Sequence, residues 1–451
     1  MDVVKTLDNF PYEKVLVLGL ARSGEAAAQL LYDSNVSFRI NDLTPIENNE
    51  VAQRFDQLGI EVVTGSHPQS VLDDVDLVVK NPGIPYSHEI VEEALNRDIP
   101  IITEVELSFY LIDGPIIAIT GSNGKTTTTT LTYELLRAGG LDPLIAGNIG
   151  KVATNVAREQ KEAQPVVMEL SSFQLKAIEK FKPDIGVLIN ITEAHLDYHK
   201  TMDDYVGSKL NITKYQNEND MLIYNADDEW LVNKVQDSKA NLLPFSVSGK
   251  NKDGLYVDHQ QVYHNDELIV YRDEIALPGD HNLENILVGI AIAKQFNIPN
   301  NTIQSVLKTF TGVKHRLQYV NKIHDRFVYN DSKATNISAT LKAIQAFKQP
   351  IILIAGGLDR GNEFDELIQA FEHVKTCIAY GQSASKIKEA GERNQYKSIQ
   401  TVDSLEEATI KAYEVSQEGD VILFSPACAS WDQFKSFEER GDMFIQLVHK
   451  L

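Results

Sequence analysis

The chain has 451 residues, which at about 150 residues per domain suggests roughly three domains. Its 64 Asp and Glu residues outnumber its 42 Lys and Arg residues, so the formal net charge is −22. This charge disfavours a protein that coats nucleic acid or an anionic membrane, because both partners require a positive surface. A phosphate-binding site must therefore be built locally, from backbone amides and a few well-placed cations.

Cysteine usage and the lengths of the apolar runs indicate the compartment. The two cysteines, Cys377 and Cys428, are too few for a disulfide framework or a cysteine zinc site. The apolar run at 15–18 is short and follows Glu13 and Lys14, so it indicates a strand rather than a signal peptide. No run of the sequence approaches the roughly 18 apolar residues that a membrane span needs. We therefore expect a soluble, cytoplasmic protein.

Short apolar runs followed by glycine-containing turns and helical patterns recur along the chain. Such runs are typical of strands buried on both faces of a parallel sheet, and their alternation with helices indicates βαβ units. We therefore predict an α/β protein with domain boundaries near residues 113–115 and 311–315. Residues 220–277 carry short strand candidates and turns, which predict an antiparallel insertion. The apolar runs are KVLVLGL, DLVVKNPG, GPIIAITGSNGKT, PVVMEL, PIILIAGG and DVILFSPA.

The first predicted strand leads into a glycine-containing loop. Residues 19–24 (GLARSG) approximate G-x-G-x-x-G, with Ala21 in place of the second glycine, and they begin a helix. Asp42 ends the next predicted strand, about where a ribose-binding acid lies in dinucleotide folds. Asn81 and Gly83 follow a third strand and are placed to line the same crevice. The pattern predicts a site for a nucleotide-like diphosphate near the helix start, and does not point specifically to NAD.

The strongest local pattern is a phosphate loop. The apolar strand at 116–120 is followed by GSNGKTT at 121–127 and then by a helix. The glycines let backbone N–H groups point at phosphate oxygens, Lys125 can reach the outer phosphates, and the Thr126 hydroxyl can bind Mg²⁺. The match to G-x-x-x-x-G-K-[ST] is incomplete, because Ile119 occupies the position of the first glycine. We predict an ATP site.

Two downstream residues, Glu169 and His195, are candidates for binding a metal. Glu169 ends the run PVVMEL, and an acid at the carboxyl end of a parallel strand beside a phosphate loop is placed to bind Mg²⁺. The alternative for Glu169 is a helix cap or a surface position, and a lone histidine such as His195 is more often structural. Lys209 lies in a helical stretch, where a lysine is by default a solvated surface residue.

Two polar loops in the last third of the chain follow predicted strands. Residues 330–336 (NDSKATN) concentrate a carboxylate, a cation and two hydroxyl groups, and residues 425–434 (SPACASWDQF) follow the run DVILF. Each loop could be no more than a polar helix start. Several such loops at strand ends fit a binding crevice better, because the carboxyl ends of parallel strands meet at one edge of a sheet.

Together these motifs resemble the ATP-dependent Mur ligases of peptidoglycan synthesis. GSNGKTTT, ELSSFQL, TEAHLDYH, HNLENILVGIAIA, GVKHRLQ, NDSKATN and SPACASWDQFKSFEERG occur in the family's order and cover essentially the whole chain. NDSKATN and SPACASWDQF resemble the branch of the family that adds D-glutamate. The resemblance implies a Rossmann-like UDP-sugar domain at 1–112, a central P-loop ATP-binding domain with a parallel sheet at 113–312, and a C-terminal Rossmann-like D-glutamate domain at 313–451.

The resemblance also implies a reaction and its partners. The chain would use ATP and two Mg²⁺ ions to join D-glutamate to UDP-N-acetylmuramoyl-L-alanine, with no nucleic acid or membrane partner, and would act as a monomer. The L-alanine carboxylate would attack the γ-phosphate of ATP, and the D-glutamate amine would then attack the acyl phosphate. Closure of the last domain would exclude water that hydrolyses the acyl phosphate.

Carried over residue by residue, the resemblance assigns the following roles. The catalytic residues are Lys125, Glu169, His195 and Lys209. The metal ligands are Thr126, Glu169, His195 and a carbamylated Lys209. The ATP-binding residues are Gly121, Ser122, Asn123, Gly124, Lys125, Thr126, Thr127, Asn282, Asn285, Arg316, Asp331 and Lys333. The sugar-nucleotide residues are Ala21, Arg22, Ser23, Asp42, Asn81, Gly83 and Asn148, and the D-glutamate residues are Thr335, Arg360, Ser430 and Phe437.

The sequence departs from the family pattern at two places. Arg360 stands where some members have lysine, which changes the geometry toward the incoming amino acid. Leu43 and Thr44 follow Asp42 where some members have Thr-Arg, so the uracil contacts beyond Asp42 stay open.

Three other functions compete with the ligase. A folylpolyglutamate synthetase shares the phosphate loop and also adds glutamate, but has no evident use for GLARSG and Asp42. An NAD-dependent oxidoreductase leaves GSNGKTT unexplained. A nucleotide-binding protein without ligase chemistry leaves the two loops of the last domain without a purpose.

Overall fold

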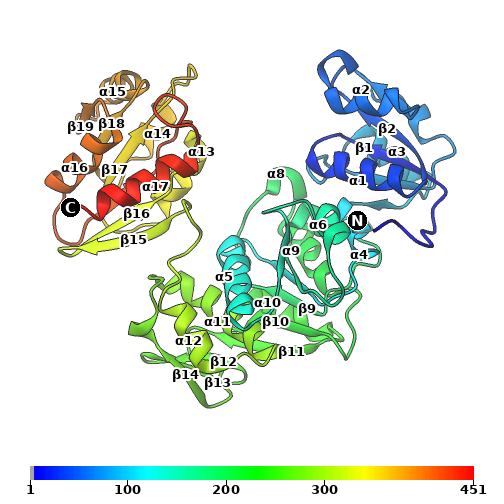
Figure 1. Ribbon diagram of the computed structural model, residues 1–451, viewed down its shortest axis with the longest axis horizontal. Coiled ribbons are helices and arrows are strands. Elements are labelled where there is room, and N and C mark those ends of the chain that lie inside the picture. Colours follow the sequence, from blue (N-terminus) through cyan, green and yellow to red (C-terminus); the bar gives the residue numbers. More distant parts are fainter. Residues whose placement is uncertain (1–4) are drawn as a thin grey trace. The chain divides into compact units, whose positions relative to one another are not determined.

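The computed structural model describes residues 5–451, without the side chains of Asp280 and His281. Its contacts group the chain into two compact units (Figure 1). The first unit comprises the chain up to Ile275 together with Gly279–Thr309, and the second comprises Ala276–Pro278 and Phe310–Leu451. The first unit holds two sheets and the second holds one, which confirms the predicted three-part α/β fold. The boundaries at 112/113 and 312/313 stay a prediction.

The first sheet is fully parallel in the described residues, with strand order β3-β2-β1-β4-β5. The order reverses between β1 and β4, and such a reversal opens a crevice beyond the carboxyl ends of the two strands. The strands are β1 Lys14–Leu18, β2 Ser37–Asp42, β3 Glu61–Thr64, β4 Leu77–Lys80 and β5 Ile101–Ile102. The helices are α1 Arg22–Asp33, α2 Glu50–Gln57, α3 Glu89–Asn96 and α4 Glu104–Phe109.

The second sheet has the order β14-β13-β12-β11-β10-β9-β6-β8-β7. β12, β13 and β14 pair antiparallel, and the other neighbours pair parallel. The strands are β6 Ile116–Thr120, β7 Leu144–Gly147, β8 Val166–Glu169, β9 Ile185–Leu188, β10 Met221–Asn225, β11 Asn241–Ser246, β12 Leu255–Asp258, β13 Gln261–His264 and β14 Glu267–Tyr271. The helices are α5 Lys125–Ala138, α6 Ala153–Glu159, α7 Ser172–Leu175, α8 Leu196–His199, α9 Met202–Leu210, α10 Glu229–Lys234, α11 Asp280–Gln295 and α12 Asn300–Leu307.

The predicted antiparallel insertion at 220–277 is wrong in its first half. β10 and β11 are parallel members of the central sheet, and the antiparallel part begins only at β12. The reason is that β10 and β11 extend the same βαβ pattern as β6 to β9, with α10 between them. Short apolar runs do not by themselves distinguish such strands from an antiparallel hairpin.

The third sheet has the order β15-β16-β20-β17-β18-β19 and is parallel except for the β15–β16 hairpin. All six residues of β17 are buried, and alternate residues enter cores on opposite faces of the sheet. The strands are β15 Gln318–Ile323, β16 Arg326–Asn330, β17 Ile351–Gly356, β18 Val374–Tyr380, β19 Ile399–Val402 and β20 Val421–Phe424. The helices are α13 Ile337–Gln345, α14 Asp365–Gln369, α15 Ala384–Arg393, α16 Leu405–Val415 and α17 Phe437–Val448.

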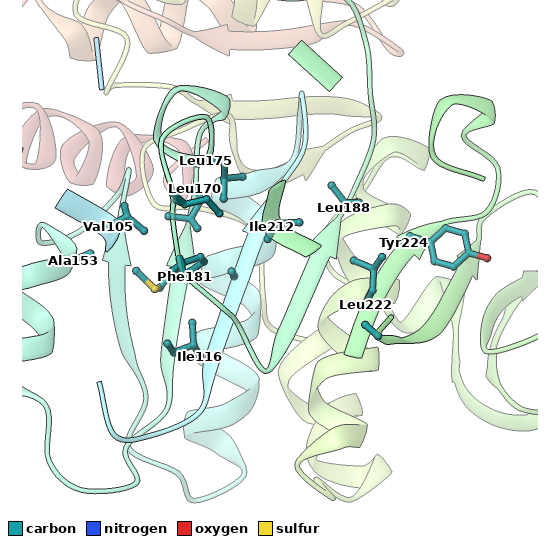
Figure 2. Packing of buried hydrophobic residues seen from close by; sticks show 14 of the residues in the cluster. Val105, Ile116, Ala153, Leu170, Leu175, Phe181, Leu188, Ile212, Leu222 and Tyr224 are labelled. Atoms are coloured by element: carbon teal, nitrogen blue, oxygen red, sulfur yellow. The ribbon is translucent and has the colours of Figure 1, made fainter. Parts of the chain in front are cut away.

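Helix α4 connects the first sheet to the second. Val105 from α4 packs with Ala153 and Phe181 in the hydrophobic core beside the central sheet (Figure 2). The Glu106 carboxylate accepts backbone N–H groups from residues 179–181 at 2.7–3.0 Å. The buried Glu104 carboxylate accepts the N–H of Thr154. These contacts stabilise the junction between the two sheets.

Neither cysteine is exposed. Cys377 lies inside β18, and burial raises the pKa of its thiol to about 12. Cys428 is also free and buried, and burial raises the pKa of its thiol. Among the described residues, no helix is both long and apolar enough to cross a membrane.

We predict that Glu104→Gln removes a pH-dependent loss of stability. Burial raises the pKa of Glu104 to about 7, and the Thr154 hydrogen bonds only partly oppose this rise. Because the pKa of Glu104 is higher in the folded state than in the unfolded state, the protonated carboxyl group stabilises the folded protein at low pH. This stabilisation is lost as the pH rises toward and through 7. The loss at pH 8 is up to about 3 kcal/mol. Urea unfolding at pH 5 and pH 8 should show a smaller pH dependence in Glu104→Gln than in the wild type.

The exposed Glu162 offers the control, since Glu162→Gln should keep the wild-type pH dependence. Equal slopes in the wild type, Glu104→Gln and Glu162→Gln would show that Glu104 does not titrate in this range.

Candidate functional site

The loop after β1 is held by the end of β2. The Asp42 carboxylate accepts the N–H of Leu20 at 2.7 Å and the N–H of Thr44 at 2.8 Å. Helix α1 begins directly after this loop, and its N-cap, Ala21, supplies no side-chain hydrogen bond. Ala21 and Arg22 are exposed. Uncapped N–H groups at a helix start can bind an anion.

The turn after β4 meets the same loop. The Asn81 side chain donates to Ser23 Oγ at 3.2 Å and accepts the N–H of Gly83 at 3.1 Å. The structure therefore brings Ser23, Asn81 and Gly83 together at the point where the strand order reverses. Asp42 lies at the end of neighbouring β2 and fixes the loop through backbone contacts.

The phosphate loop is braced by the segment after β9. The N–H groups of Ser122 and Asn123 donate to the backbone and side-chain oxygens of Asn190, both at 2.9 Å. The Ser122 hydroxyl donates to the carbonyl of Thr192 at 2.9 Å. Lys125 donates to the carbonyls of residues 121 and 122 at 2.7 and 3.0 Å. The Lys125 ammonium group is therefore placed over the loop.

Helix α11 contacts the start of α5, next to the phosphate loop. Asn285 accepts from the Thr128 hydroxyl at 3.0 Å and donates to Asn282 Oδ1 at 3.0 Å. Gly124 is the N-cap of α5, with φ of 81°, and a Cβ added there would lie 2.1 Å from Asn285 Oδ1. The close approach of α11 thus requires glycine at this position. Thr126 is buried in the first turn of α5, and Thr127 is half-buried beside it.

Glu169 ends β8, the strand beside β6. Its Oε1 accepts the Asn148 side-chain amide at 2.8 Å, whereas Oε2 is buried and has no hydrogen-bond partner. The residue is only 1% exposed, so a surface position is wrong for Glu169. An orphaned buried carboxylate oxygen suits a cation, because leaving it unpaired is unfavourable.

Lys209 is also buried, at 2% exposed, so a solvated surface position is wrong. Helix α9 turns this residue toward the phosphate loop, where Nζ donates to the Gly121 carbonyl at 2.8 Å. Burial, and then the charge of Lys125, hold the pKa of Lys209 well below its ordinary value. This environment favours the neutral, nucleophilic amine.

His195 occupies the left-handed region, with φ of 57°, at the N-terminus of α8. Its ring is exposed, and its centroid lies 5.0 Å from the Phe173 ring and 6.3 Å from the Tyr205 ring. Within the described part of the chain, no three His, Cys, Asp or Glu side chains form a metal-binding cluster. Magnesium commonly keeps several waters and takes one or two carboxylates plus substrate phosphates, so the residues present fit that ion.

His199, which the sequence did not single out, lies at the C-terminal end of α8 and contacts Phe173 and Tyr205, as His195 does. Its ring hydrogen-bonds with Ser172 Oγ at 2.9 Å and with Asp204 at 3.1 Å, and stacks on Phe173. Burial lowers the pKa of His199. The i, i+4 spacing of the two histidines in HLDYH was the available signal for a second functional histidine.

The second unit carries the remaining candidates. Asp331 accepts from the Leu317 N–H at 3.1 Å and the Ser425 hydroxyl at 2.8 Å, and burial raises its pKa to about 6. Arg316 is close enough to oppose this shift electrostatically. Lys333 Nζ lies 6.0 Å from the centre of the Phe437 ring.

The predicted D-glutamate residues lie on several loops of this unit. Thr335 is half-buried after β16, and Ser430 is buried in the loop after β20. Phe437 begins α17, and its carbonyl accepts the Ser332 hydroxyl at 2.7 Å. Arg360 stacks over the exposed Trp431 ring at 4.8 Å.

Arg440 connects the loops after β16 and β20 and was not singled out from sequence. Its guanidinium is 0% exposed and donates to Ser332 Oγ at 3.0 Å, Ser332 O at 2.7 Å and Cys428 O at 3.0 Å. No carboxylate oxygen among the described residues lies within 4.0 Å of it. In the sequence, Arg440 belongs to EERG at 438–441, shortly after SPACASWDQF, and this position was the available indication of its role.

Comparisons with known proteins find relatives along almost the whole chain. Three family descriptions match the chain: a Mur ligase MurD-like N-terminal domain at 13–103, a Mur ligase middle domain at 119–293, and a Mur ligase glutamate ligase domain at 315–428. Curated relatives from Bacillus thuringiensis (strain Al Hakam) and Bacillus anthracis are named UDP-N-acetylmuramoylalanine--D-glutamate ligase. Each is 52% identical over 449 residues, covering 99% of this chain and 100% of the relative.

Solved structures share the fold. MurF ligase from Thermotoga maritima in complex with ADP matches with a TM-score of 0.52 at 18% identity, covering 91% of this chain and 95% of that one. MurF from Acinetobacter baumannii matches with a TM-score of 0.52 at 17% identity, covering 97% and 90%.

We predict that Gly124→Ala lowers the affinity for ATP at least tenfold, which corresponds to about 1.4 kcal/mol. The added Cβ would displace Asn285 and would also sit at positive φ. Gly140→Ala is the matched control, because Gly140 has φ of 87° but open space around its Cβ position. Titration calorimetry with ATP should separate the two variants. Equal affinities would contradict the role assigned to the contact between Gly124 and Asn285.

Proposed function

The chain belongs to the Mur ligase family, and on that premise we propose that it is the ATP-dependent ligase that adds D-glutamate to UDP-N-acetylmuramoyl-L-alanine in peptidoglycan precursor synthesis. The observation that carries this proposal is 52% identity, over the whole length, with relatives that bear this ligase's name. A folylpolyglutamate synthetase is not favoured, because residues 13–103 match the MurD-like N-terminal domain.

The reaction needs activation because a carboxylate is a poor acyl donor. The L-alanine carboxylate attacks the γ-phosphorus of ATP, ADP leaves, and an acyl phosphate forms. The D-glutamate amine then attacks the acyl carbon, loses a proton, and phosphate leaves. Lys125 and the N-terminus of α5 offset the negative charge of the transferred phosphoryl group.

We assign each substrate to a set of residues on the loops of the two units. We infer that Ala21, Arg22, Ser23, Asp42, Asn81, Gly83 and Asn148 bind the sugar nucleotide. The ATP contacts are the phosphate loop with Asn282 and Asn285, and Arg316, Asp331 and Lys333. The D-glutamate contacts are Thr335, Arg360, Ser430 and Phe437, with Arg440 holding the loops around them. Because a single chain carries all three sets, we propose a monomer, acting in the cytoplasm where ATP is available.

Four of the candidate residues are assigned to magnesium. We propose that Thr126 and Glu169 hold one ion, and that His195 and a carbamylated Lys209 hold or orient a second. Bound magnesium neutralises charge on the phosphates and on the attacking carboxylate. The orphaned Oε2 of Glu169 supports this proposal.

Carbamylation of Lys209 is chemically consistent with its environment. The neutral amine nitrogen attacks the carbon of CO₂, an N–C bond forms, and one proton is released. The product is an anion at a place where the ammonium form would repel magnesium. The lowered pKa of Lys209 supports the first step, because only the neutral amine has the required lone pair.

We predict that ATP yields phosphate only when UDP-N-acetylmuramoyl-L-alanine and D-glutamate are both present. Phosphate release should be measured with D-glutamate, L-glutamate, L-lysine and meso-diaminopimelate in parallel. Release with another amino acid would keep the ligase but overturn the assignment of Thr335, Ser430 and Phe437. No release with any of the four would overturn the proposed reaction.

We predict that Lys209→Ala folds but loses at least 99% of the ligase activity, since the anion beside the phosphate loop is absent. Lys182→Ala is the control, because Lys182 is a half-buried lysine paired with Asp220 in the same unit. In ¹³C-bicarbonate, the wild type should show a carbamate carbon resonance that Lys209→Ala lacks and Lys182→Ala keeps. Wild-type rates from Lys209→Ala would contradict the role proposed for carbamylated Lys209.

A further inference from the structure

Lys80, the last residue of β4, is buried without a carboxylate partner. Its side chain is 1% exposed, and no Asp or Glu oxygen among the described side chains lies within 4.0 Å of Nζ. Burial, and to a lesser degree the charge of Lys176, lower the pKa of Lys80 to about 7. A lysine in such a place is unfavourable unless its N–H groups are hydrogen-bonded.

The partners of Lys80 are the carbonyls of one turn. Nζ donates to the carbonyl oxygens of Asn81 at 3.1 Å, Pro82 at 3.2 Å and Ile84 at 2.8 Å. This turn carries Asn81 and Gly83, which contact each other, and Asn81 also donates to Ser23 at the crevice of the first sheet. The turn is thus folded around the Lys80 nitrogen.

Tyr198 contacts the same turn from helix α8. Its hydroxyl lies 3.3 Å from Lys80 Nζ and donates to the carbonyls of Pro82 at 3.3 Å and Ile84 at 3.2 Å. Tyr198 lies on α8, which begins after His195. The Tyr198 and His195 rings both pack against Phe173, at 4.5 and 5.0 Å. A partly buried network of hydrogen bonds and ring contacts therefore connects the turn to the helix beside His195.

We propose that Lys80 is a positioning residue for the sugar nucleotide. It preorganises the turn at 81–84 for binding, and through Tyr198 it fixes the distance between that turn and His195. The inference rests on the proposed function, which assigns Asn81 and Gly83 to the sugar nucleotide. Neither Lys80 nor Tyr198 needs to touch the substrate, because both act through the backbone of the turn.

The test compares Michaelis constants for the three substrates in Lys80→Met, Tyr198→Phe and the wild type. Methionine fills a similar volume but donates no hydrogen bond, so the KM for UDP-N-acetylmuramoyl-L-alanine should rise about tenfold, equivalent to about 1.4 kcal/mol. The KM values for ATP and D-glutamate should stay within twofold. Tyr198→Phe should raise the same KM about threefold, and the double variant should show less than the product of the two effects.

Lys182→Met is the matched control and should leave all three KM values unchanged. Thermal unfolding of each variant separates a folding defect from a positioning defect. If Lys80→Met does not fold, Tyr198→Phe decides, because it keeps the ring that packs on Phe173.

Each outcome has one meaning. A selective rise in the KM for the sugar nucleotide supports the positioning role. Unchanged KM values in a folded Lys80→Met, or in Tyr198→Phe where Lys80→Met does not fold, would overturn it while the proposed function stands. A fall in kcat and melting temperature with no KM change would likewise leave only a structural role. A wild type that does not use this substrate would overturn the proposed function, and the inference with it.

Discussion

Backbone carbonyl oxygens hold three buried cationic or amine groups in this protein. Lys80, Lys209 and Arg440 are each at most 2% exposed, and none of them has a carboxylate within 4.0 Å among the described side chains. Moving such groups from water into a protein interior is unfavourable by several kcal/mol per ion unless oxygen atoms replace the water. Here the replacement oxygens come from loops at the carboxyl ends of strands. The loops are thereby fixed where the proposed ligands bind.

An acidic chain must also bind three anionic substrates. A net charge of −22 repels them at long range, but that repulsion is screened within about 10 Å at ordinary ionic strength. Beside the phosphate loop, positive charge is supplied by Lys125 and by the start of α5. Selectivity then depends on geometry rather than on overall charge.

Much of the fold and part of the site followed from the sequence. Short apolar runs identified β6, β8, β17 and β20, and GSNGKTT identified the strand, loop and helix that bear Lys125. Periodicity could not show that α9 turns Lys209 inward, because this depends on how α9 packs against the phosphate loop. Nor could it show that Arg440 donates a hydrogen bond to Ser332, which is 108 residues away in the sequence. Such contacts are set by tertiary packing, and a local pattern contains no information about them.

The burial of both cysteines has a practical consequence. Raised pKa values and lack of access make Cys377 and Cys428 poor targets for thiol reagents. The natural chain is therefore a low-background scaffold for spectroscopic labels. A cysteine introduced at exposed Lys161 in the first unit and another at exposed Lys388 in the second would each accept a probe. Resonance energy transfer between the two labels would then follow the units directly as each substrate is added.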